Sequence, residues 1–273
     1  MPENKVMPPG AAVSRIESGM TVAIGGFLGQ GAPLTLIRAL RDSRVSDLTV
    51  YANDAGFGDA GIVELIRLGK VKALHCCHVG YTPAVTGAVE SGMLELVWTP
   101  QGNLIEMMRC GGAGLGGFLT PTGVGTSVAE GKEHVTVDGK TFFWEQAVRV
   151  DIGLIQAHAG DMVGNLCHRG TARNYNPIVA SCADYVIAEV EHICCAGELD
   201  PERIHTCGIV VDAVVRATED RREPQRKRER VGAVAGGSSD TKCAIAARAA
   251  RELQDGEVIN LASIFHEGSR DLF

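Results

Sequence analysis

The segment Gly19-Met20-Thr21-Val22-Ala23-Ile24-Gly25-Gly26-Phe27-Leu28-Gly29-Gln30-Gly31-Ala32-Pro33 decides the fold class of this 273-residue chain. Its first part is a short apolar run, which predicts a buried strand over residues 21–25. The glycines that follow predict a tight turn, because glycine adopts backbone conformations that other residues avoid. Pro33 suits the first turn of a helix, where its missing N–H is not needed. The segment therefore predicts a strand, a glycine-rich loop and a helix in succession.

This predicted loop has the properties of an anion-binding site. Glycines let backbone N–H groups approach a ligand closely, and the N-terminus of the following helix favours negative charge. We therefore expect the loop to hold an anionic, nucleotide-like molecule; a purely structural tight turn is the alternative. It is neither a P-loop nor a dinucleotide fingerprint, because no Gly-Lys-Ser/Thr follows and the glycines lack the G-x-G-x-x-G spacing.

The same alternation of strand and helix continues along the chain. We predict strands over residues 21–25, 48–52, 73–79 and 94–98, and helices over residues 33–41, 60–67, 83–91 and 103–109. Further strands are predicted over residues 152–157, 185–191 and 209–215. Apolar strands separated by helices indicate an α/β fold with a doubly wound, mostly parallel sheet and a single main domain. Residues 135–143 alternate around Asp138-Gly139, which predicts an inserted β-hairpin with a type I′ turn.

Composition restricts the function classes. The net charge of −7 gives no overall attraction to nucleic acid or to an anionic membrane, so we expect neither partner. No apolar run is long enough to span a bilayer, and residues 1–10 lack the pattern of a signal peptide, so we expect a cytoplasmic protein. The nine scattered cysteines are interpreted as reduced, mostly buried thiols.

The composition changes near Arg216. Residues 216–230 carry dense charge of both signs without an apolar period, and residues 232–239 are rich in Gly, Ala and Ser. We predict a main domain over residues 10–215 and a flexible linker over residues 216–240; a solvated helix face is the alternative for the charged stretch. Residues 241–273 would form one helix and one strand, which is too little for a core of their own.

Several motifs in order resemble the alpha (A) subunit of family I CoA-transferases, most closely those acting on acetate, acetoacetate and other short-chain acids. The first is Gly25-Gly26-Phe27 followed by Gly31 and Pro33, with Ser18 where the family usually has Asp or Asn. The resemblance covers most of residues 10–215. It continues through Thr99-Pro100-Gln101-Gly102-Asn103-Leu104, residues 111–126, Gly164-Asn165-Leu166, Ala172-Arg173-Asn174-Tyr175-Asn176-Pro177 and Gly197-Glu198-Leu199-Asp200-Pro201.

The resemblance implies that this chain contacts coenzyme A through its glycine-rich loop. The implied contact residues are Gly25, Gly26, Phe27, Leu28, Gly29, Gln30 and Gly31. Gln101 and Gly102 are the expected substrate-binding residues, since a position just after a strand is the usual place for a ligand in an open sheet. Gln101 could hydrogen-bond an acyl carbonyl or a carboxylate; a polar helix cap is the alternative.

The resemblance also implies a partner. In this family the acyl-CoA is attacked by a glutamate of the beta subunit, and the resulting glutamyl-CoA thioester passes CoA to a carboxylic acid. The beta-subunit motif Ser-Glu-Asn-Gly is absent here, although residues 241–261 resemble the start of a beta subunit, so that segment is interpreted as truncated or altered. We expect no catalytic residue in this chain, a hetero-oligomer with a beta subunit, and an acyl-CoA such as acetyl-CoA or succinyl-CoA with small carboxylic or 3-oxo acids as substrates. A non-catalytic homologue that binds CoA or a partner subunit is the alternative.

Other motifs are interpreted as structural. Gly112, Gly114 and Gly117 have the G-x-G-x-x-G spacing, but they follow a helix, which argues against a nicotinamide enzyme; we expect an ordered loop lining the active site or a subunit contact. The run His75-Cys76-Cys77-His78 is interpreted as a strand whose alternating side chains cannot converge on zinc. We expect no metal site and no permanently bound cofactor. Arg173 is expected to pair with a substrate carboxylate or in a structural ion pair.

Overall fold

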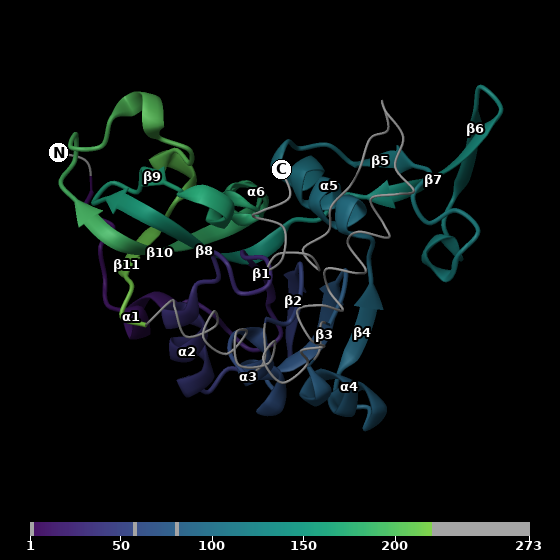
Figure 1. The fold of residues 1–273 in the computed structure, drawn as a ribbon, viewed down its shortest axis with the longest axis horizontal. Coiled ribbons are helices and arrows are strands. Elements are labelled where there is room, and N and C mark those ends of the chain that lie inside the picture. Colours follow the sequence, from purple (N-terminus) through teal and green to yellow (C-terminus); the bar gives the residue numbers. More distant parts are fainter. Residues whose placement is uncertain (1–2, 57–58, 80–81, 220–273) are drawn as a thin grey trace, which may run out of the picture. The chain divides into compact units, whose positions relative to one another are not determined.

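The computed structural model describes residues 3–56, 59–79 and 82–219. Its main element is a parallel sheet with the strand order β11-β10-β8-β1-β2-β3-β4, to which β9 adds an antiparallel pairing with β8 (Figure 1). These strands are β1 Thr21–Ile24, β2 Leu48–Ala52, β3 Val71–Cys76, β4 Glu95–Trp98, β8 Val150–Asp161, β9 Leu166–Cys167, β10 Ala183–Cys194 and β11 Ala213–Arg216. The predicted parallel α/β sheet is confirmed.

The sheet is covered on both faces, as a doubly wound fold requires. Alternate residues of β1 divide between two hydrophobic clusters: Val22 and Ile24 belong to one cluster, and Ala23 to the other. The first cluster contains side chains from α1 to α4 and the second contains side chains from α5 and α6, on opposite faces of the sheet (Figure 1). These helices are α1 Pro9–Val13, α2 Leu34–Asp42, α3 Ile62–Arg67, α4 Pro83–Glu90, α5 Gln101–Gly112 and α6 Asn176–Cys182.

A second, antiparallel sheet has the order β5-β7-β6. Its strands are β5 Gly117–Thr120, β6 His134–Val137 and β7 Lys140–Gln146. The predicted hairpin is confirmed, because Asp138 and Gly139 have φ angles of 49° and 75°, as a type I′ turn requires. Four short 3₁₀ helices complete the described residues: η1 Ser127–Ala129, η2 Gly170–Arg173, η3 Pro201–Arg203 and η4 Gly208–Val210.

Two sequence-based predictions, for residues 111–117 and for residues 209–215, are wrong in detail. The run 111–117 is not a single loop: Gly111 and Gly112 end α5, and Gly117 begins β5. Gly111 serves close packing, because a Cβ there would overlap the Val148 carbonyl. Residues 209–215 are not one strand, since the 3₁₀ helix η4 occupies their first part and β11 begins only at Ala213.

The predicted strand over residues 73–79 begins at Val71 and ends at Cys76. Cys77 and His78 therefore follow the strand rather than continue its alternation. The described cysteines are all free, but the expectation that they are mostly buried holds only for some: Cys76, Cys110 and Cys182 are buried, whereas Cys195 and Cys207 are exposed. Burial raises the pKa of the Cys76 thiol to about 12, so this thiol stays protonated at neutral pH.

The main domain continues slightly beyond residue 215. Arg216 ends β11, the Ala217 N–H donates to Val190 O, and the Thr218 N–H donates to Thr35 Oγ1. The first residues of the predicted linker are thus packed on the domain. The remainder of the 216–240 linker and the predicted segment 241–273 lie outside the described residues, and those boundaries stay predictions. Among the described residues, no helix has both the length and the apolar character needed to cross a membrane.

Candidate functional site

The glycine-rich loop lies where the sheet changes its direction of winding. After β1 the chain adds β2, β3 and β4 on one side, whereas β8, β10 and β11 build the other side. Ile24 at the end of β1 pairs with both Ala52 of β2 and Leu154 of β8. In an open parallel sheet, ligands bind outside the carboxyl ends of the strands at this switch point. The loop predicted from sequence as a binding element therefore has the position that such an element needs.

The loop itself is a compact turn. Phe27 and Gln30 exchange two backbone hydrogen bonds of 2.9 Å, and between them Leu28 and Gly29 have positive φ angles of 46° and 81°. Leu28 is strained in this conformation, which side chains other than Asn and Asp rarely adopt. Its N–H donates to Asp54 Oδ2 over 2.8 Å, which holds the turn down on the end of β2.

Some backbone N–H groups of the loop are left for a ligand. Gly25 N donates to Leu154 O, and Phe27, Leu28 and Gln30 donate as described above. The N–H groups of Gly26, Gly29 and Gly31 make no hydrogen bond to another described residue. All three glycines are only partly buried. Free N–H groups gathered in one loop can bind an oxygen acceptor of a ligand.

Two of the glycines also have a structural reason to be glycine. A Cβ on Gly25 would overlap Asn176 Oδ1, and a Cβ on Gly31 would lie 2.8 Å from Asn176 Nδ2 and 2.9 Å from Ala172 O. Asn176 is fully buried; it accepts from Gln156 N and donates to Gly31 O. Asn174 Nδ2 likewise donates to Gln30 O. The polar turn before α6 thus positions the loop, which supports the structural interpretation, and ligand binding by the loop stays a prediction.

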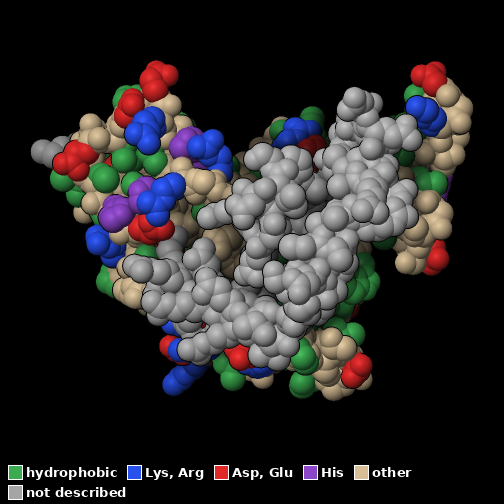
Figure 2. Space-filling model, viewed as in Figure 1, with side chains coloured by type: hydrophobic (Ala, Val, Ile, Leu, Met, Phe, Trp, Pro, Cys, Tyr) green, Lys and Arg blue, Asp and Glu red, His purple; other side chains and the backbone are tan. Residues whose placement is uncertain are grey.

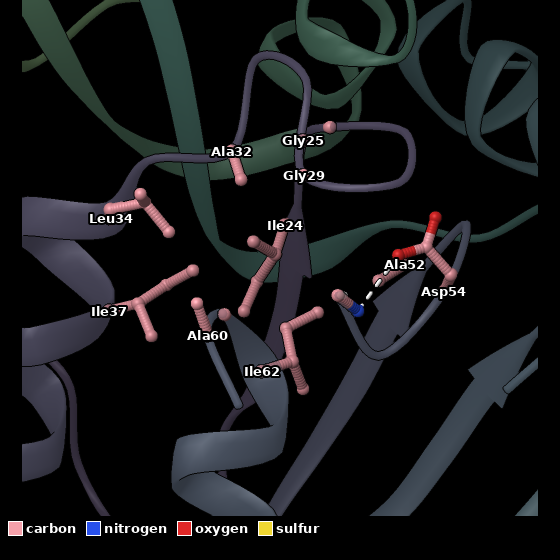
Figure 3. Close-up of a pocket in the computed structure, with 13 residues that line it drawn as sticks. Ile24, Gly25, Gly29, Ala32, Leu34, Ile37, Ala52, Asp54, Ala60 and Ile62 are labelled. Carbon is pink, nitrogen blue, oxygen red and sulfur yellow. Dashed lines mark hydrogen bonds between the residues drawn. The ribbon is translucent and has the colours of Figure 1, made fainter. Parts of the chain in front are cut away.

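A small apolar gap lies beneath the loop. Figure 3 shows Ile24, Ile37 and Ile62 around it, with the Asp54 carboxylate at its rim and a hydrogen bond from Gly56 N to Asp54 Oδ1. The gap has a volume of about 20 Å³, which is roughly the space that one water needs. It is therefore a packing gap beneath the loop and has no room for an acyl chain.

The predicted substrate residue Gln101 lies beside this loop in a polar network. Gln101 is the first residue of α5, and its Nε2 donates to Asn53 Oδ1 over 3.0 Å. Pro100 is the N-cap residue of α5, and the hydrogen bond of the Gln101 side chain goes to Asn53 rather than to the helix backbone, so the helix-cap alternative is wrong. Asn53 Nδ2 in turn donates to Asp54 Oδ2 over 2.6 Å. The network therefore connects the ends of β2 and β4 to the glycine-rich loop.

Cys77, which directly follows β3, also belongs to this hydrogen-bond network. Its thiol donates to Asn53 O over 3.0 Å, and burial raises its pKa to about 11, so it is a protonated donor and not a thiolate nucleophile. Gly102 follows Gln101 in the first turn of α5, is exposed, and has open space where a Cβ would point. A ligand can approach the backbone there, as the prediction of a substrate contact requires.

Sequence reasoning did not identify Asn53, Asp54 or the role of Asn176. Asn53 and Asp54 are buried, yet they directly follow the apolar strand β2, and this polar pair at a strand end was the available signal. Arg173 was predicted to pair with a carboxylate or in a structural ion pair. Among the described residues its Nη2 lies 2.7 Å from His205 Nε2 and forms no ion pair with a carboxylate of the chain, so pairing with a substrate carboxylate stays a prediction.

A larger cavity of about 310 Å³ lies next to the loop. It shares Gly29 to Ala32 with the loop and extends to polar groups of β8 and β10, among them Gln156, His158 and Glu191. Pockets that hold small ligands begin at about this size.

One known protein family and several known proteins resemble this chain over most of its length. The model of the family described as Coenzyme A transferase matches residues 6–217. A relative in Escherichia coli K12, the alpha subunit of acetate CoA-transferase, is 46% identical over 219 residues, which cover 80% of this chain and 100% of the relative. In Bacillus subtilis 168, one subunit of a probable succinyl-CoA:3-ketoacid coenzyme A transferase is 44% identical, covering 79% of this chain and 91% of that protein.

Solved structures share the fold. Glutaconate coenzyme A-transferase from Acidaminococcus fermentans superimposes with a TM-score of 0.71 at 23% identity, covering 78% of this chain and 75% of that chain. An acyl-CoA transferase from Escherichia coli O157:H7, solved as a thioester complex with CoA, gives a TM-score of 0.70 at 23% identity. This chain spans 47% of the length of that second protein and is itself covered to 79%.

Proposed function

Since this chain belongs to the coenzyme A transferase family, we propose that it is the alpha subunit of an enzyme that moves CoA between a short-chain acyl-CoA and a small carboxylic or 3-oxo acid. The donor is acetyl-CoA, succinyl-CoA or a similar thioester. The two relatives described above, each a single subunit of a CoA-transferase, support this assignment at 46% and 44% identity. The observation that carries the proposal is the glycine-rich loop, with its free N–H groups beside Gln101 at the switch point of the sheet.

In the proposed reaction, a glutamate of a partner beta subunit attacks the thioester carbonyl and displaces CoA as its thiolate, which gives an acyl-glutamyl anhydride. The CoA thiolate then attacks the glutamyl carbonyl, the donor acid leaves as its carboxylate, and the resulting glutamyl-CoA thioester passes CoA to the acceptor acid by the reverse of these steps. The chain's own part is to bind and orient the thioester. The N–H groups of Gly26, Gly29 and Gly31 bind an acceptor oxygen of the CoA thioester, while Gln101 and Gly102 contact the acyl group or the acid. Negative charge developing on a carbonyl oxygen is stabilised by N–H donors held in place before the reaction.

The carboxylate nearest to this loop is not suited to be the nucleophile. Asp54 accepts hydrogen bonds from the Leu28 N–H, the Gly56 N–H and Asn53 Nδ2. It is also buried, with 5% of its surface exposed. A carboxylate whose lone pairs accept three N–H bonds is tied to the backbone and cannot reach a thioester without breaking the loop. This supports a nucleophile supplied by a partner, and it equally fits a non-catalytic homologue that binds CoA or a subunit without turnover.

The test is co-expression of the full chain with candidate beta subunits that carry Ser-Glu-Asn-Gly. CoA exchange between acetyl-CoA and a panel of short-chain acids is then measured for the isolated chain, the isolated beta subunit and the complex. We expect activity only in the complex. Absence of exchange in a stable complex that still binds CoA would favour the non-catalytic alternative, and robust turnover by the isolated chain would contradict the proposed partner.

We also infer that the protein is cytoplasmic and that CoA is a substrate rather than a resident cofactor. The described cysteines are all free, including the exposed Cys195 and Cys207. Unpaired, accessible thiols are typical of a reducing compartment.

A further inference from the structure

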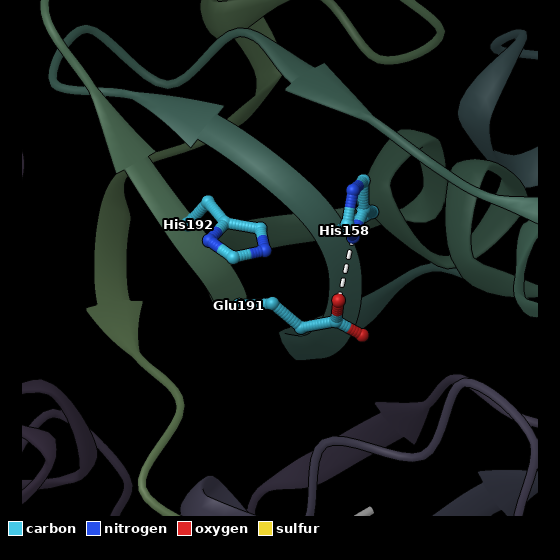
Figure 4. Close-up of side chains that lie close together, drawn as sticks. All are labelled: His158, Glu191 and His192. Carbon is cyan, nitrogen blue, oxygen red and sulfur yellow. Dashed lines mark hydrogen bonds and ion pairs between the residues drawn. The ribbon is translucent and has the colours of Figure 1, made fainter.

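A cluster of three side chains lies outside the network around Gln101. His158 comes from β8, and Glu191 and His192 come from β10, and their side chains lie close together (Figure 4). One potential ligand atom from each residue lies within 4.8 Å of the other two. His158 Nδ1 and Glu191 Oε2 are 2.5 Å apart, and the two imidazole rings are 5.0 Å apart between centroids. Three side chains with lone pairs to donate therefore meet in one place.

The composition of this cluster is that of a metal site. Two imidazoles and one carboxylate bind Zn²⁺ and related divalent ions, whereas Mg²⁺ and Ca²⁺ prefer oxygen ligands only. We propose that His158, Glu191 and His192 bind a divalent transition-metal ion of the Zn²⁺ type, with water in the remaining coordination positions. From the sequence we expected no metal site. His158 and His192 are far apart in the chain, and the pairing of β8 with β10 brings them together.

The distances between the ligand atoms of His158, Glu191 and His192 are close to those found around a bound metal ion. Zn²⁺ lies about 2.0–2.2 Å from nitrogen and oxygen ligands, so two ligand atoms at tetrahedral angles are roughly 3.3 Å apart. His158 and Glu191 must separate slightly from their hydrogen-bonded position, and His192 must approach. The side chains of His158 and Glu191 are 27% and 24% exposed, and His192 is exposed, so small side-chain rotations suffice.

A second observation independently indicates a missing hydrogen-bond donor. Gln156 is 1% exposed, and its Oε1 is a buried acceptor with no partner among the described residues. Gln156 lines the same cavity of about 310 Å³ as His158 and Glu191. Its Nε2 donates to Ala157 O, which fixes the amide orientation and leaves Oε1 as the unpaired atom. Oε1 is enclosed in the present arrangement, so a water bound to a metal ion in this cavity would satisfy it only after the Gln156 side chain turns towards the cavity.

The charges around the cluster set the strength of the site. Arg169 Nη2 lies 3.5 Å from Glu191 Oε2, and the Arg169 side chain is 68% exposed. The guanidinium opposes a bound cation, but its exposure allows it to turn towards solvent. Figure 2 shows histidine and basic side chains beside one another on the surface over this part of the sheet. Removing the Arg169 charge should therefore strengthen metal binding, whereas it would weaken a plain ion-pair network.

The experiment uses the full chain, stripped of metal with a chelator and without an affinity tag. Zn²⁺ binding is measured by calorimetry, and Co²⁺ is used as a spectroscopic probe of the ligands. We expect one ion per chain, with the affinity reduced at least about 100-fold in His158→Ala and His192→Ala, because loss of even an outer partner costs 10–100-fold. Arg169→Ala should bind more tightly than the wild type.

Controls separate this site from other metal ligands. His134→Ala removes an exposed histidine of the hairpin, and Cys195→Ser removes an exposed thiol three residues after His192 in the sequence; both should bind like the wild type. X-ray absorption of the Zn²⁺-loaded wild type should show imidazole nitrogen and oxygen without sulfur, which tests the ligands even where a variant fails to fold. Absence of stoichiometric binding, binding that survives both histidine variants, or sulfur ligation would each overturn the proposal. None of these measurements depends on CoA transfer.

Discussion

Gln101 Nε2 donates a 3.0 Å hydrogen bond to Asn53 Oδ1 across 48 residues of sequence. Through Asn53 and Asp54 this bond connects the first turn of α5 to the N–H of Leu28 in the glycine-rich loop. The side chain predicted to contact substrate is thus held in place by residues that sequence reasoning did not identify. Positioning of this kind matters because small misplacements of a binding group cost activity.

Gln101→Ala should lower kcat/KM of the complex with a beta subunit by about 10²-fold or more, the range seen when one preorganised hydrogen-bond donor is removed. Because Gln101 is exposed, the free energy of unfolding should change by less than about 1 kcal/mol. Gln146→Ala, an exposed glutamine of β7 outside the candidate site, is the matched control for both measurements. Unchanged kcat/KM in Gln101→Ala would remove Gln101 from the substrate site.

Gly102→Val should weaken substrate binding without changing the stability of the fold. A Cβ on Gly102 meets nothing within 4 Å, so the folded chain can accommodate a branched side chain at this position. We expect a higher KM with a melting temperature within a few degrees of the wild type. Gly87→Val in α4, where a Cβ also has open space, controls for the helix propensity of valine. Equal KM values for the two variants would show that Gly102 does not contact substrate.

Gly25→Ala should destabilise the fold, because the added Cβ overlaps the Asn176 amide that positions the loop. Overpacking of this kind costs about 1–3 kcal/mol. Gly87→Ala should instead be neutral or stabilising by up to about 1 kcal/mol, as expected for a helical glycine with free space. Urea unfolding of both variants measures the difference, and equal midpoints would mean that the loop moves freely away from Asn176.

His168 should make stability depend on pH. Burial is the main cause that lowers its pKa to about 4, and its ring nitrogens lie 2.9 Å from Gln156 O and Thr206 Oγ1. The unfolded chain binds a proton near pH 6.5 and the folded chain only near pH 4, so protonation favours unfolding. Stability is therefore present above pH 6.5 and is lost as the pH falls towards 4, by up to roughly 3 kcal/mol.

The check on His168 is urea unfolding from pH 7 to pH 4 for the wild type and for His168→Gln, which cannot titrate. The variant should lose most of the wild-type slope in this window. His134→Gln, which changes an exposed histidine, should keep it. An unchanged slope in His168→Gln would mean that other groups cause the acid sensitivity.

The sequence by itself determined the fold class, the strand–loop–helix unit around Gly25 and the type I′ hairpin at Asp138-Gly139. These features follow from local patterns: apolar periodicity, glycine conformational freedom and turn chemistry are all encoded within about ten residues. The contact positions of the loop and Gln101 were predicted from position after a strand together with family resemblance.

Only the tertiary structure decided which side chains meet. Asn53 accepts a hydrogen bond from Gln101, and Asn176 occupies the space where a Cβ on Gly25 would lie. His158 lies beside His192. These contacts form because parallel strands that are distant in sequence lie next to one another in the sheet. The run 111–117 is likewise settled by tertiary structure: its first residues end α5 and Gly117 begins β5. Packing of Gly111 against Val148 outweighs the loop-forming tendency of glycine. Register between distant strands depends on the whole hydrophobic core, and no local window of sequence contains it.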